Sequence, residues 1–356
     1  MARPCVLIYT HALAGGGAER VCAVLARGFH DRGWRVLLAV DSEHGANRGF
    51  AGNGLDVRVL GPDHLRGVGR LATLLRRERP DISLSAMAAS NAKHAAAALL
   101  AGRHRRAVLS YHAFAASEPQ RLSQVGYRLI PVLSRITART AAVSDDLRRN
   151  LVARWHAAPG RTVTLYNPVQ VGPDLSRLPA DGPPLVLTAG RLVPDKDVAG
   201  IVRAFARVAS RRPLRLAILG EGPERAAIVA EAERLGVRHC VHLPGYVAEP
   251  WEFYRRAACF VTASRLESFS MVVAEALAYG LPVVACDSPG PREVLEGGRY
   301  GFLVPPNDEA ALAAAMERAL DAPSDAVEAG ERGRAFSVEN GIAAYERVFR
   351  VIMEGG

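Results

Sequence analysis

The sequence predicts an α/β protein made of two domains, each with a parallel sheet. Short apolar runs, typical of buried strands, alternate with longer segments of helical period in both halves of the chain. A stretch rich in Pro, Gly and Asp, residues 169–184, separates the two halves. The chain has 356 residues, which is enough for two hydrophobic cores.

The first half begins with a strand, a glycine-rich loop and a helix. The elements predicted for this half are strands at 5–9, 35–40, 57–60, 82–84 and 107–111 and helices at 18–32, 68–79, 91–101 and from Asp145. The second half repeats the alternation. Its predicted elements are strands at 185–189, 214–219, 241–243, 260–262 and 283–286 and helices at 224–235, 308–322 and 338–353.

The composition indicates a soluble globular chain without disulfides. Hydrophobic residues make up 49% of the chain, and no run approaches the roughly 20 apolar residues that span a bilayer. Ala12–Ala14 is similar to a signal-cleavage site, but the apolar run before it is too short for a signal peptide. The five cysteines are scattered, odd in number and never spaced C-x-x-C, which argues for a reducing cytoplasm and against a zinc site.

Charge is distributed unevenly along the chain. Residues 1–170 contain 24 basic and 11 acidic side chains, whereas residues 171–356 contain 21 and 25. A basic half favours nucleic acid, an anionic membrane or an anionic substrate. No nucleic-acid-binding signature is evident, so a membrane surface is the favoured partner. The alternative is arginine enrichment from a GC-rich genome, because all but two of the 45 basic residues are Arg; the two lysines are Lys93 and Lys196.

Residues Gly15–Gly17 predict a turn on the phosphate side of a ligand. Glycine lets the backbone approach a ligand closely, and a helix follows directly. The rival is a dinucleotide-binding fingerprint, with Asp41 as the acidic residue after the second strand. That fingerprint fails because Arg20 stands at the last glycine position of G-x-G-x-x-G, which disfavours a nicotinamide enzyme.

The stretch from Glu267 to Asp287 combines two glutamates, a helical segment and a strand. A helix that starts between Glu267 and Glu275 would offer unpaired backbone N–H groups to a phosphate. Glu275 would lie about one turn inside this helix, beside hydroxyls next to the phosphate, and Glu267 in the loop before it. The alternative is an ordinary amphipathic helix flanked by two surface glutamates.

Three polar residues follow predicted strands, where ligands of open parallel sheets bind. His112 comes after the strand at 107–111, and Arg191 and Lys196 come after the strand at 185–189. Two cations in that place would hold a diphosphate whose negative charge grows as a bond to it breaks. A structural histidine and two surface cations are the alternatives.

An arginine-rich segment at 114–139 has helical spacing. Arg121, Arg128, Arg135 and Arg139 are seven, seven and four residues apart, so they share one helical face, which Pro131 would divide. Such a face would lie on a membrane, or it would be the solvated side of a packed helix.

A series of short motifs spans nearly the whole chain. They are, in order, Gly15–Gly17, Ser110–His112, Tyr166–Val169, Ala189–Asp197, Gly220–Pro223, the Glu267/Glu275 pair and Ser288–Glu293. In this order they resemble the retaining glycosyltransferases of family 4. The resemblance implies the GT-B fold, in which two Rossmann-like domains face each other across a cleft. These domains would be 1–168 and 185–337, joined by the linker 169–184, with the last helix, 338–356, crossing back to the first domain.

The resemblance also implies which residues form the site. Catalytic roles are expected for Glu267, His112, Arg191 and Lys196. Donor binding is expected for Gly16, Gly17, Val247, Phe269, Ser270, Val272, Val273 and Glu275. No metal or other cofactor is expected, because the cations would do the work of a metal. No protein nucleophile is assigned, because in this family the departing phosphate is taken to deprotonate the acceptor.

Two positions depart from the family pattern. Ser270 stands where a glycine usually follows Glu-x-Phe, and its side chain would either crowd the phosphate or help to bind it. Ala113 and Phe114 follow His112 where the family often has an acidic residue, so no orienting partner for His112 is evident.

The predicted activity is transfer of a hexose or N-acetylhexosamine from a nucleotide sugar, UDP-linked in our interpretation, to a lipid-linked or polysaccharide acceptor in bacterial glycan synthesis. The expected partners are this donor, this acceptor and the inner face of the cell membrane, without nucleic acid, and the expected location is the cytoplasm. One alternative is a GDP-mannose-dependent mannosyltransferase. Another is a nucleotide-sugar-binding scaffold protein, against which Lys196 and the two glutamates argue.

Overall fold

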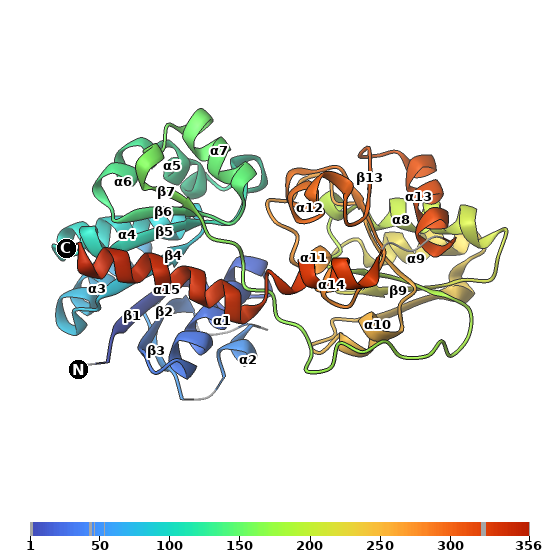
Figure 1. Ribbon diagram of the computed structural model, residues 1–356. Helices are drawn as coiled ribbons and strands as arrows, with labels where there is room; N and C mark the ends of the chain where they lie inside the picture. Colours follow the sequence, from blue (N-terminus) through green and yellow to red (C-terminus); the bar gives the residue numbers. More distant parts are fainter. Residues whose placement is uncertain (1–2, 43–44, 46, 53, 322–324, 356) are drawn as a thin grey trace. The chain divides into compact units, whose positions relative to one another are not determined.

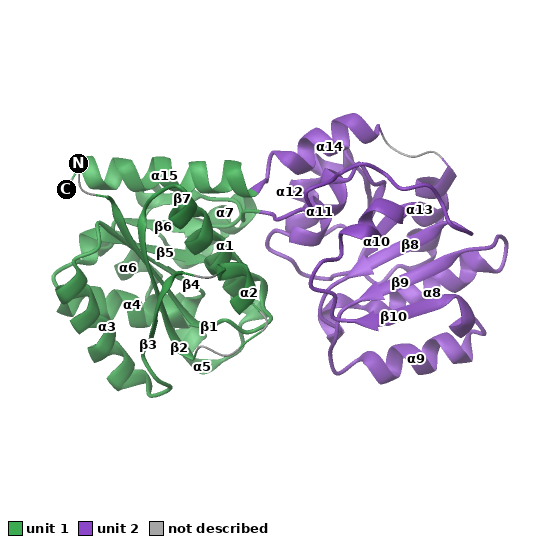
Figure 2. Ribbon diagram, turned by 90° about the horizontal axis from the view of Figure 1, so that it is seen from below, with its two compact units in different colours: residues 1–168, 338–356 green, residues 169–337 purple. Residues whose placement is uncertain are grey.

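The chain folds into two compact units, coloured separately in Figure 2. This computed structural model describes residues 3–42, 45, 47–52, 54–321 and 325–355. Unit 1 comprises residues 1–168 and 338–356, and unit 2 comprises residues 169–337. Each unit has a parallel sheet packed with helices, so both are Rossmann-like α/β halves, as predicted.

Unit 1 contains a seven-stranded sheet, within the described residues, in the order β3-β2-β1-β4-β5-β6-β7. Its strands are β1 (Cys5–Ala12), β2 (Arg35–Ser42), β3 (Asp56–Val59), β4 (Ile82–Ala86), β5 (Ala107–Tyr111), β6 (Arg139–Ala142) and β7 (Thr162–Thr164). Its helices are α1 (Gly17–Asp31), α2 (Arg48–Ala51), α3 (His64–Glu78), α4 (Ala88–Leu100), α5 (Arg121–Arg128), α6 (Ile130–Ile136), α7 (Asp145–Trp155) and α15 (Val338–Glu354), with 3₁₀ turns at His104–Arg106, Ala115–Ser117 and Pro159–Arg161. The strand order reverses between β1 and β4, which marks the ligand-binding edge of such sheets.

Unit 2 contains a six-stranded sheet, again within the described residues, in the order β10-β9-β8-β11-β12-β13. Its strands are β8 (Leu185–Ala189), β9 (Arg215–Leu219), β10 (Val241–Gly245), β11 (Cys259–Thr262), β12 (Val283–Cys286) and β13 (Phe302–Val304). Its helices are α8 (Val198–Ala209), α9 (Arg225–Arg234), α10 (Trp251–Arg256), α11 (Met271–Ala278), α12 (Pro289–Val294), α13 (Glu309–Asp321) and α14 (Ala326–Arg334), with 3₁₀ turns at Pro194–Lys196, Arg238–Cys240 and Glu296–Gly298. Here the strand order reverses between β8 and β11.

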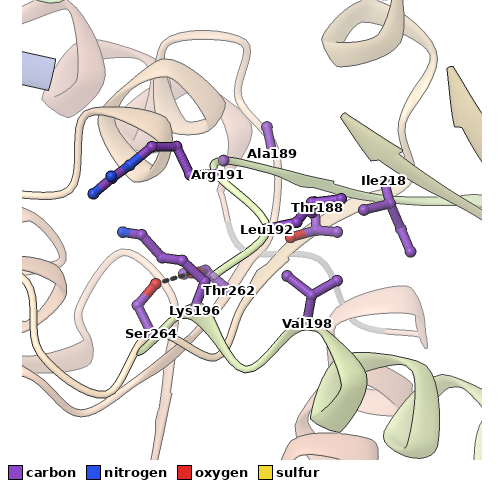
Figure 3. A pocket seen from close by; sticks show the side chains of 10 residues that line it. Thr188, Ala189, Arg191, Leu192, Lys196, Val198, Ile218, Thr262 and Ser264 are labelled. Atoms are coloured by element: carbon purple, nitrogen blue, oxygen red, sulfur yellow. Dashed lines mark hydrogen bonds between the residues drawn. The ribbon is translucent and has the colours of Figure 1, made fainter. Parts of the chain in front are cut away.

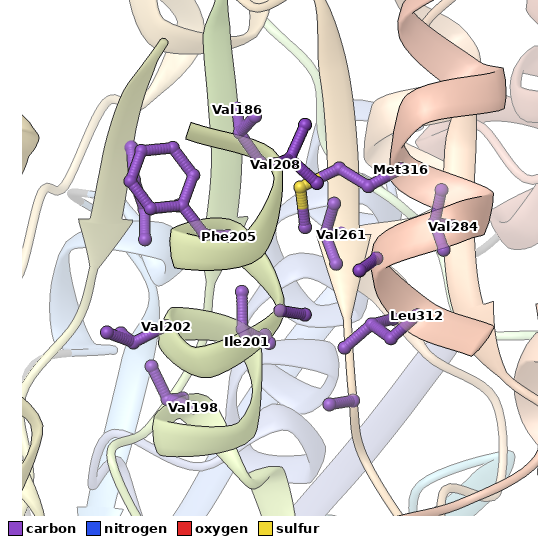
Figure 4. Close-up of a cluster of buried hydrophobic side chains, with 14 of the residues drawn as sticks. Val186, Val198, Ile201, Val202, Phe205, Val208, Val261, Val284, Leu312 and Met316 are labelled. Carbon is purple, nitrogen blue, oxygen red and sulfur yellow. The ribbon is translucent and has the colours of Figure 1, made fainter. Parts of the chain in front are cut away.

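The core on one face of the second sheet is formed by α8 and α13 (Figure 4). Ile201, Phe205 and Val208 of α8 lie over the strands, and Leu312 and Met316 of α13 complete the layer. All five side chains are buried, because the apolar positions of both helices recur every three or four residues and face the sheet. This packing holds β8 and β11, whose carboxyl ends border the candidate site.

The last helix, α15, belongs to unit 1 and lies beside α1 (Figure 1). The rings of Phe29 and Phe349 stack with centroids 5.3 Å apart. A Cβ atom at Gly28 would come within 1.7 Å of the Ile342 side chain, so glycine permits the close approach of the two helices. The expected return of the C-terminal helix to the first domain is confirmed.

The arginine-rich segment differs from its prediction in one respect. Pro131 divides it into α5 and α6, as expected, because a proline fits the first turn of a helix and not its interior. Arg139, however, is the first residue of β6 and pairs with Val108, so its assignment to the same helical face was wrong. Arg121, Arg128 and Arg135 are exposed on the two helices.

Candidate functional site

A small pocket lies in unit 2 at the carboxyl ends of β8 and β11 (Figure 3). Its volume is about 10 Å³, close to the space that one water needs, so a larger ligand would cover its mouth. The lining mixes apolar and hydroxyl side chains, and the side chains of Arg191 and Lys196 extend toward the same side in Figure 3. The lining residues are Thr188, Ala189, Gly190, Arg191, Leu192, Lys196, Val198, Ile218, Thr262 and Ser264.

Lys196 and Glu267, both predicted as catalytic, form an ion pair. Lys196 Nζ donates to Glu267 Oε1 over 2.5 Å, and the two side chains are 27% and 9% exposed. Burial alone would raise the pKa of Glu267, but the Lys196 ammonium outweighs it and lowers this pKa. Glu267 is therefore ionised at neutral pH, and Lys196 is a cation that water still reaches.

The loop that carries Glu267 leads into α11 through an unusual backbone position. Ser270, at the helix N-cap, has φ of 70° and ψ of 75°, in the left-handed region. Glycine enters this region freely, whereas a residue with a side chain pays about 1–2 kcal/mol. This conformation explains why a glycine would suit this position. Gly290 of α12 supports the loop, because its N–H donates to the Glu267 carbonyl over 2.8 Å.

Three residues predicted to bind the donor lie at the start of α11. Phe269 is buried and contacts the edge of Phe336, with ring centroids 5.2 Å apart. Val273 is buried and Val272 half-buried. The side chains of Phe269 and Val273 thus belong to the core, which leaves backbone atoms as their means of contacting a phosphate.

Glu275 lies in the interior of α11 with its carboxylate covered. The side chain is 2% exposed, and the Tyr254 hydroxyl donates to Oε2 over 2.8 Å. A contact between Glu275 and ribose hydroxyls stays a prediction, and it requires access to an oxygen that the protein covers. Val247, predicted to contact the base, is half-buried in the loop after β10.

The remaining predicted site residues belong to unit 1. Gly16 is the N-cap of α1 and Gly17 its first residue; a Cβ atom at Gly16 would lie 2.1 Å from the Glu19 carboxylate. His112 follows β5, and its Nε2 lies 3.0 Å from Ser110 Oγ. Burial lowers the pKa of His112 to about 4, so the imidazole is neutral at pH 7. The residues after His112 offered no partner for its ring, whereas the structure places the Ser110 hydroxyl beside it.

Several site residues were missed in the sequence. Thr188, Thr262 and Ser264 line the pocket, with the hydroxyl oxygens of Thr262 and Ser264 3.1 Å apart. These three residues could have been found in the sequence as small hydroxyl residues at the carboxyl ends of predicted strands. Tyr254, the partner of Glu275, lies 21 residues away in α10, a helix too short to predict by periodicity.

Two family models together match most of the chain. Residues 15–172 match the model described as Glycosyltransferase Family 4, and residues 176–336 match the model described as Glycosyl transferases group 1. The chain belongs to the family 4, group 1 glycosyltransferases. This glycosyltransferase is 35% identical over 184 residues to a GDP-mannose-dependent alpha-mannosyltransferase of Mycobacterium tuberculosis, covering 49% of the chain and 45% of the relative.

Two further comparisons support the family and the fold. The chain is 30% identical over 176 residues to an N-acetylgalactosamine-N,N'-diacetylbacillosaminyl-diphospho-undecaprenol 4-alpha-N-acetylgalactosaminyltransferase of Campylobacter jejuni, covering 48% of each protein. The match thus spans about half the length of these two curated relatives. The structure of Anabaena Alr3699/HepE in complex with UDP and glucose has a TM-score of 0.82 at 20% identity, covering 96% of this chain and 98% of that one. The glycosyltransferase therefore has the GT-B fold.

Among the described residues, no helix combines the length and the apolar character that a bilayer span needs.

Proposed function

We propose that this glycosyltransferase is a retaining hexosyltransferase that binds the diphosphate of a nucleotide sugar at the pocket of unit 2. The Lys196–Glu267 ion pair, next to Arg191 at the reversal of strand order, is the observation that carries the proposal. Lys196 is partly exposed, so it can donate to a phosphate oxygen while Glu267 turns to the hydroxyls of the donor sugar. Fixed cations in this place stabilise the charge of a departing nucleoside diphosphate.

The proposed reaction needs no metal ion. Arg191 and Lys196 are two positive charges beside the proposed diphosphate, the role that a divalent cation fills in other sites. The departing phosphate takes the proton of the acceptor hydroxyl on the face that it leaves, so the anomeric configuration is retained. Transfer should continue at an undiminished rate in excess EDTA, and loss of activity that Mg²⁺ or Mn²⁺ restores would refute this part of the proposal.

The proposed donor is a UDP-hexose or UDP-N-acetylhexosamine, and the acceptor a lipid-linked or polysaccharide glycan in bacterial glycan synthesis. The relative in C. jejuni, which is named for transfer to a diphospho-undecaprenol-linked sugar, motivates the acceptor class. The M. tuberculosis relative, named for GDP-mannose, makes a mannosyltransferase the second candidate. Five free cysteines, four of them buried, suit a reducing cytoplasm, where such donors are found.

Calorimetric titration with UDP, GDP and ADP tests the donor class. UDP should bind tightest of the three nucleotides. Turnover of a panel of UDP-sugars with a polyprenyl-diphosphate glycan as acceptor then identifies the transferred sugar. Tighter binding of GDP would favour the mannosyltransferase. Binding of all three without turnover of any nucleotide sugar would leave a binding protein, and absence of nucleotide binding would refute the proposal.

We also propose that α5 and α6 lie on the cytoplasmic face of the cell membrane. Val125, Leu129 and Val132 are exposed apolar side chains spaced four and three residues apart, and exposed Arg128 and Arg135 lie among them. Apolar residues flanked by arginine suit the boundary of an anionic bilayer.

Sedimentation with vesicles tests this membrane contact. The protein should bind vesicles that contain phosphatidylglycerol and should not bind pure phosphatidylcholine vesicles. Val132→Asp should abolish binding, whereas Val327→Asp, at a somewhat more exposed valine of α14 in unit 2, should leave it unchanged. Equal loss in both variants, or equal binding to both lipids, would refute the contact.

A further inference from the structure

The other lysine of the chain, Lys93, forms an ion pair in unit 1. Lys93 Nζ, from α4, donates to Asp41 Oδ2 at the end of β2 over 2.6 Å, and the two side chains are 7% and 0% exposed. The Tyr9 hydroxyl donates to the same carboxylate over 3.1 Å, and burial together with Asp41 keeps the pKa of Tyr9 high. Asp41 is thus a buried carboxylate held in one position.

His11, near the end of β1, is the exposed member of this cluster. Its Nδ1 lies 2.9 Å from Asp41 Oδ2, and its side chain is 60% exposed. A carboxylate only accepts hydrogen bonds, so Nδ1 donates its proton to Asp41. In the neutral ring Nε2 then carries the lone pair on the side away from Asp41, where it accepts a hydrogen bond from outside.

Helix α3 closes the cluster on one side. A Cβ atom at Gly67 would lie 3.4 Å from Lys93 Nζ and 3.7 Å from Asp41 Oδ1, so α3 packs directly against the ion pair. One turn earlier on the same helix, His64 places its ring centroid 6.3 Å from that of His11. The two imidazoles are therefore neighbours, and both residues are exposed.

The position of His11 in the sheet favours a ligand site. The strand order reverses between β1 and β4, and His11 stands near the carboxyl end of β1. A purely structural ion pair accounts for Lys93, Asp41 and Tyr9. This ion pair does not explain why the exposed imidazole of His11 is held in one tautomer by a buried carboxylate. Ordering an exposed side chain costs rotamer freedom, which a surface residue without a role would keep.

We propose that His11 and His64 form a site in unit 1 that binds a hydroxyl group of the acceptor glycan. His11 Nε2 accepts the hydrogen bond from the sugar hydroxyl, Asp41 is the positioning residue for the ring, and Lys93 holds Asp41 in place. The inference rests on the proposed function, since the hydroxyl belongs to the acceptor of that transfer. It adds the residues that recognise this acceptor.

The test uses the full chain with ¹⁵N-labelled histidine and records the imidazole nitrogens by NMR at pH 7.5. The Nδ1–H tautomer is expected for His11. Methyl glycosides of glucose, galactose, mannose and N-acetylglucosamine are then added one at a time, with inorganic phosphate as the second probe. At least one glycoside should shift the Nε2 resonance of His11 with saturation, and phosphate should not.

The variants separate recognition from structure. His11→Phe should lower the affinity for the responsive glycoside by about fivefold or more, the factor for one lost hydrogen bond. His11→Gln, which keeps an acceptor oxygen, should lose less, and His30→Phe, at an exposed histidine of α1, should lose nothing. Asp41→Asn should release the tautomer of His11; if that variant does not fold, the tautomer of the wild type decides the role of Asp41.

Several results would overturn the inference. They are an Nε2–H tautomer in the wild type, a response to phosphate without a response to any glycoside, and no response to any probe. These outcomes are independent of nucleotide binding in unit 2. A protein that binds UDP and fails here keeps the proposed function and loses the inference, whereas one that binds glycosides at His11 and no nucleotide loses the proposed function and keeps only a glycan site that is not an acceptor site.

Discussion

The two lysines of this arginine-rich chain form two ion pairs at comparable places in two sheets, but with different exposure. Lys93–Asp41 in unit 1 and Lys196–Glu267 in unit 2 each lie near a reversal of strand order. Lys93 is 7% exposed, whereas Lys196 is 27% exposed. A lysine ammonium is a compact charge with freely rotating donors, so it serves equally to hold a carboxylate and to exchange between a carboxylate and a phosphate.

This difference in exposure indicates different roles for the two lysines. The pair in unit 1 is removed from water, so the ammonium stays on Asp41 and fixes whatever Asp41 orients. The pair in unit 2 can open, because water and a ligand reach the lysine. The same residue type thus supports a positioning role in one unit and a binding role in the other.

Removing Lys93 should produce the largest effect on stability. Lys93→Met leaves Asp41 as a buried charge without its cation, which costs about 3–5 kcal/mol. Urea unfolding followed by fluorescence should show this loss, and Lys196→Met should cost less, since that site is partly hydrated. If both variants lose the same free energy of unfolding, the distinction between the two pairs is wrong.

Acid should weaken the two units in different pH ranges. Because burial lowers the pKa of His112 to about 4, its neutral ring contributes stability that is complete above pH 6.5 and is lost as the pH falls toward 4. This loss amounts to about 3 kcal/mol at most. The lowered pKa of Glu267 affects stability at lower pH. Its contribution to the free energy of unfolding is complete above pH 4.5 and is lost below that pH.

The difference in unfolding free energy between the wild type and His112→Gln isolates the histidine term. Measured from pH 7.5 to 4.5, the wild type should lose stability relative to this variant. A constant difference over that range would show that His112 titrates normally. The corresponding difference for Glu267→Gln should change only below about pH 4.5.

The smallest effect concerns the backbone beside the exposed pair. Ser270→Gly should stabilise the protein by about 1 kcal/mol, because glycine adopts the positive φ of this position without strain. Ser270→Ala keeps the strain and is the matched control, so it should show no gain. A gain for alanine equal to that for glycine would mean that the serine hydroxyl, and not the backbone, is unfavourable here.

Much of the architecture followed from periodicity and strand alternation. The strands near Cys5, Leu185 and Val283 are short apolar runs, and the long helices α13 and α15 bury one apolar face each, which are the signals that sequence patterns report. α8, β7, α10 and α14 were not predicted; β7 has three residues, α10 has six, and α14 is rich in glycine and charge. α3 begins at His64, four residues before its predicted start, because Asp63 caps it through a bond from the Arg66 N–H.

The candidate site was predictable in its residue types but not in its contacts. The ion pair of Lys196 with Glu267 joins residues 71 positions apart, and the hydrogen bond of Tyr254 to Glu275 depends on how α10 packs. The left-handed conformation at Ser270 also has no sequence signal other than the glycine that a family pattern would place there. Such facts depend on tertiary packing, which one sequence does not specify locally.

Titration calorimetry of UDP with Lys196→Met tests whether the exposed ion pair of unit 2 binds the donor diphosphate. This variant should lose about 1.5–3 kcal/mol of binding free energy, the value of a hydrogen bond to a charged group. Arg211→Met, which breaks an exposed ion pair with Glu317 in the same unit, should bind UDP within twofold of the wild type. Wild-type affinity in Lys196→Met would show that Lys196 does not bind the diphosphate.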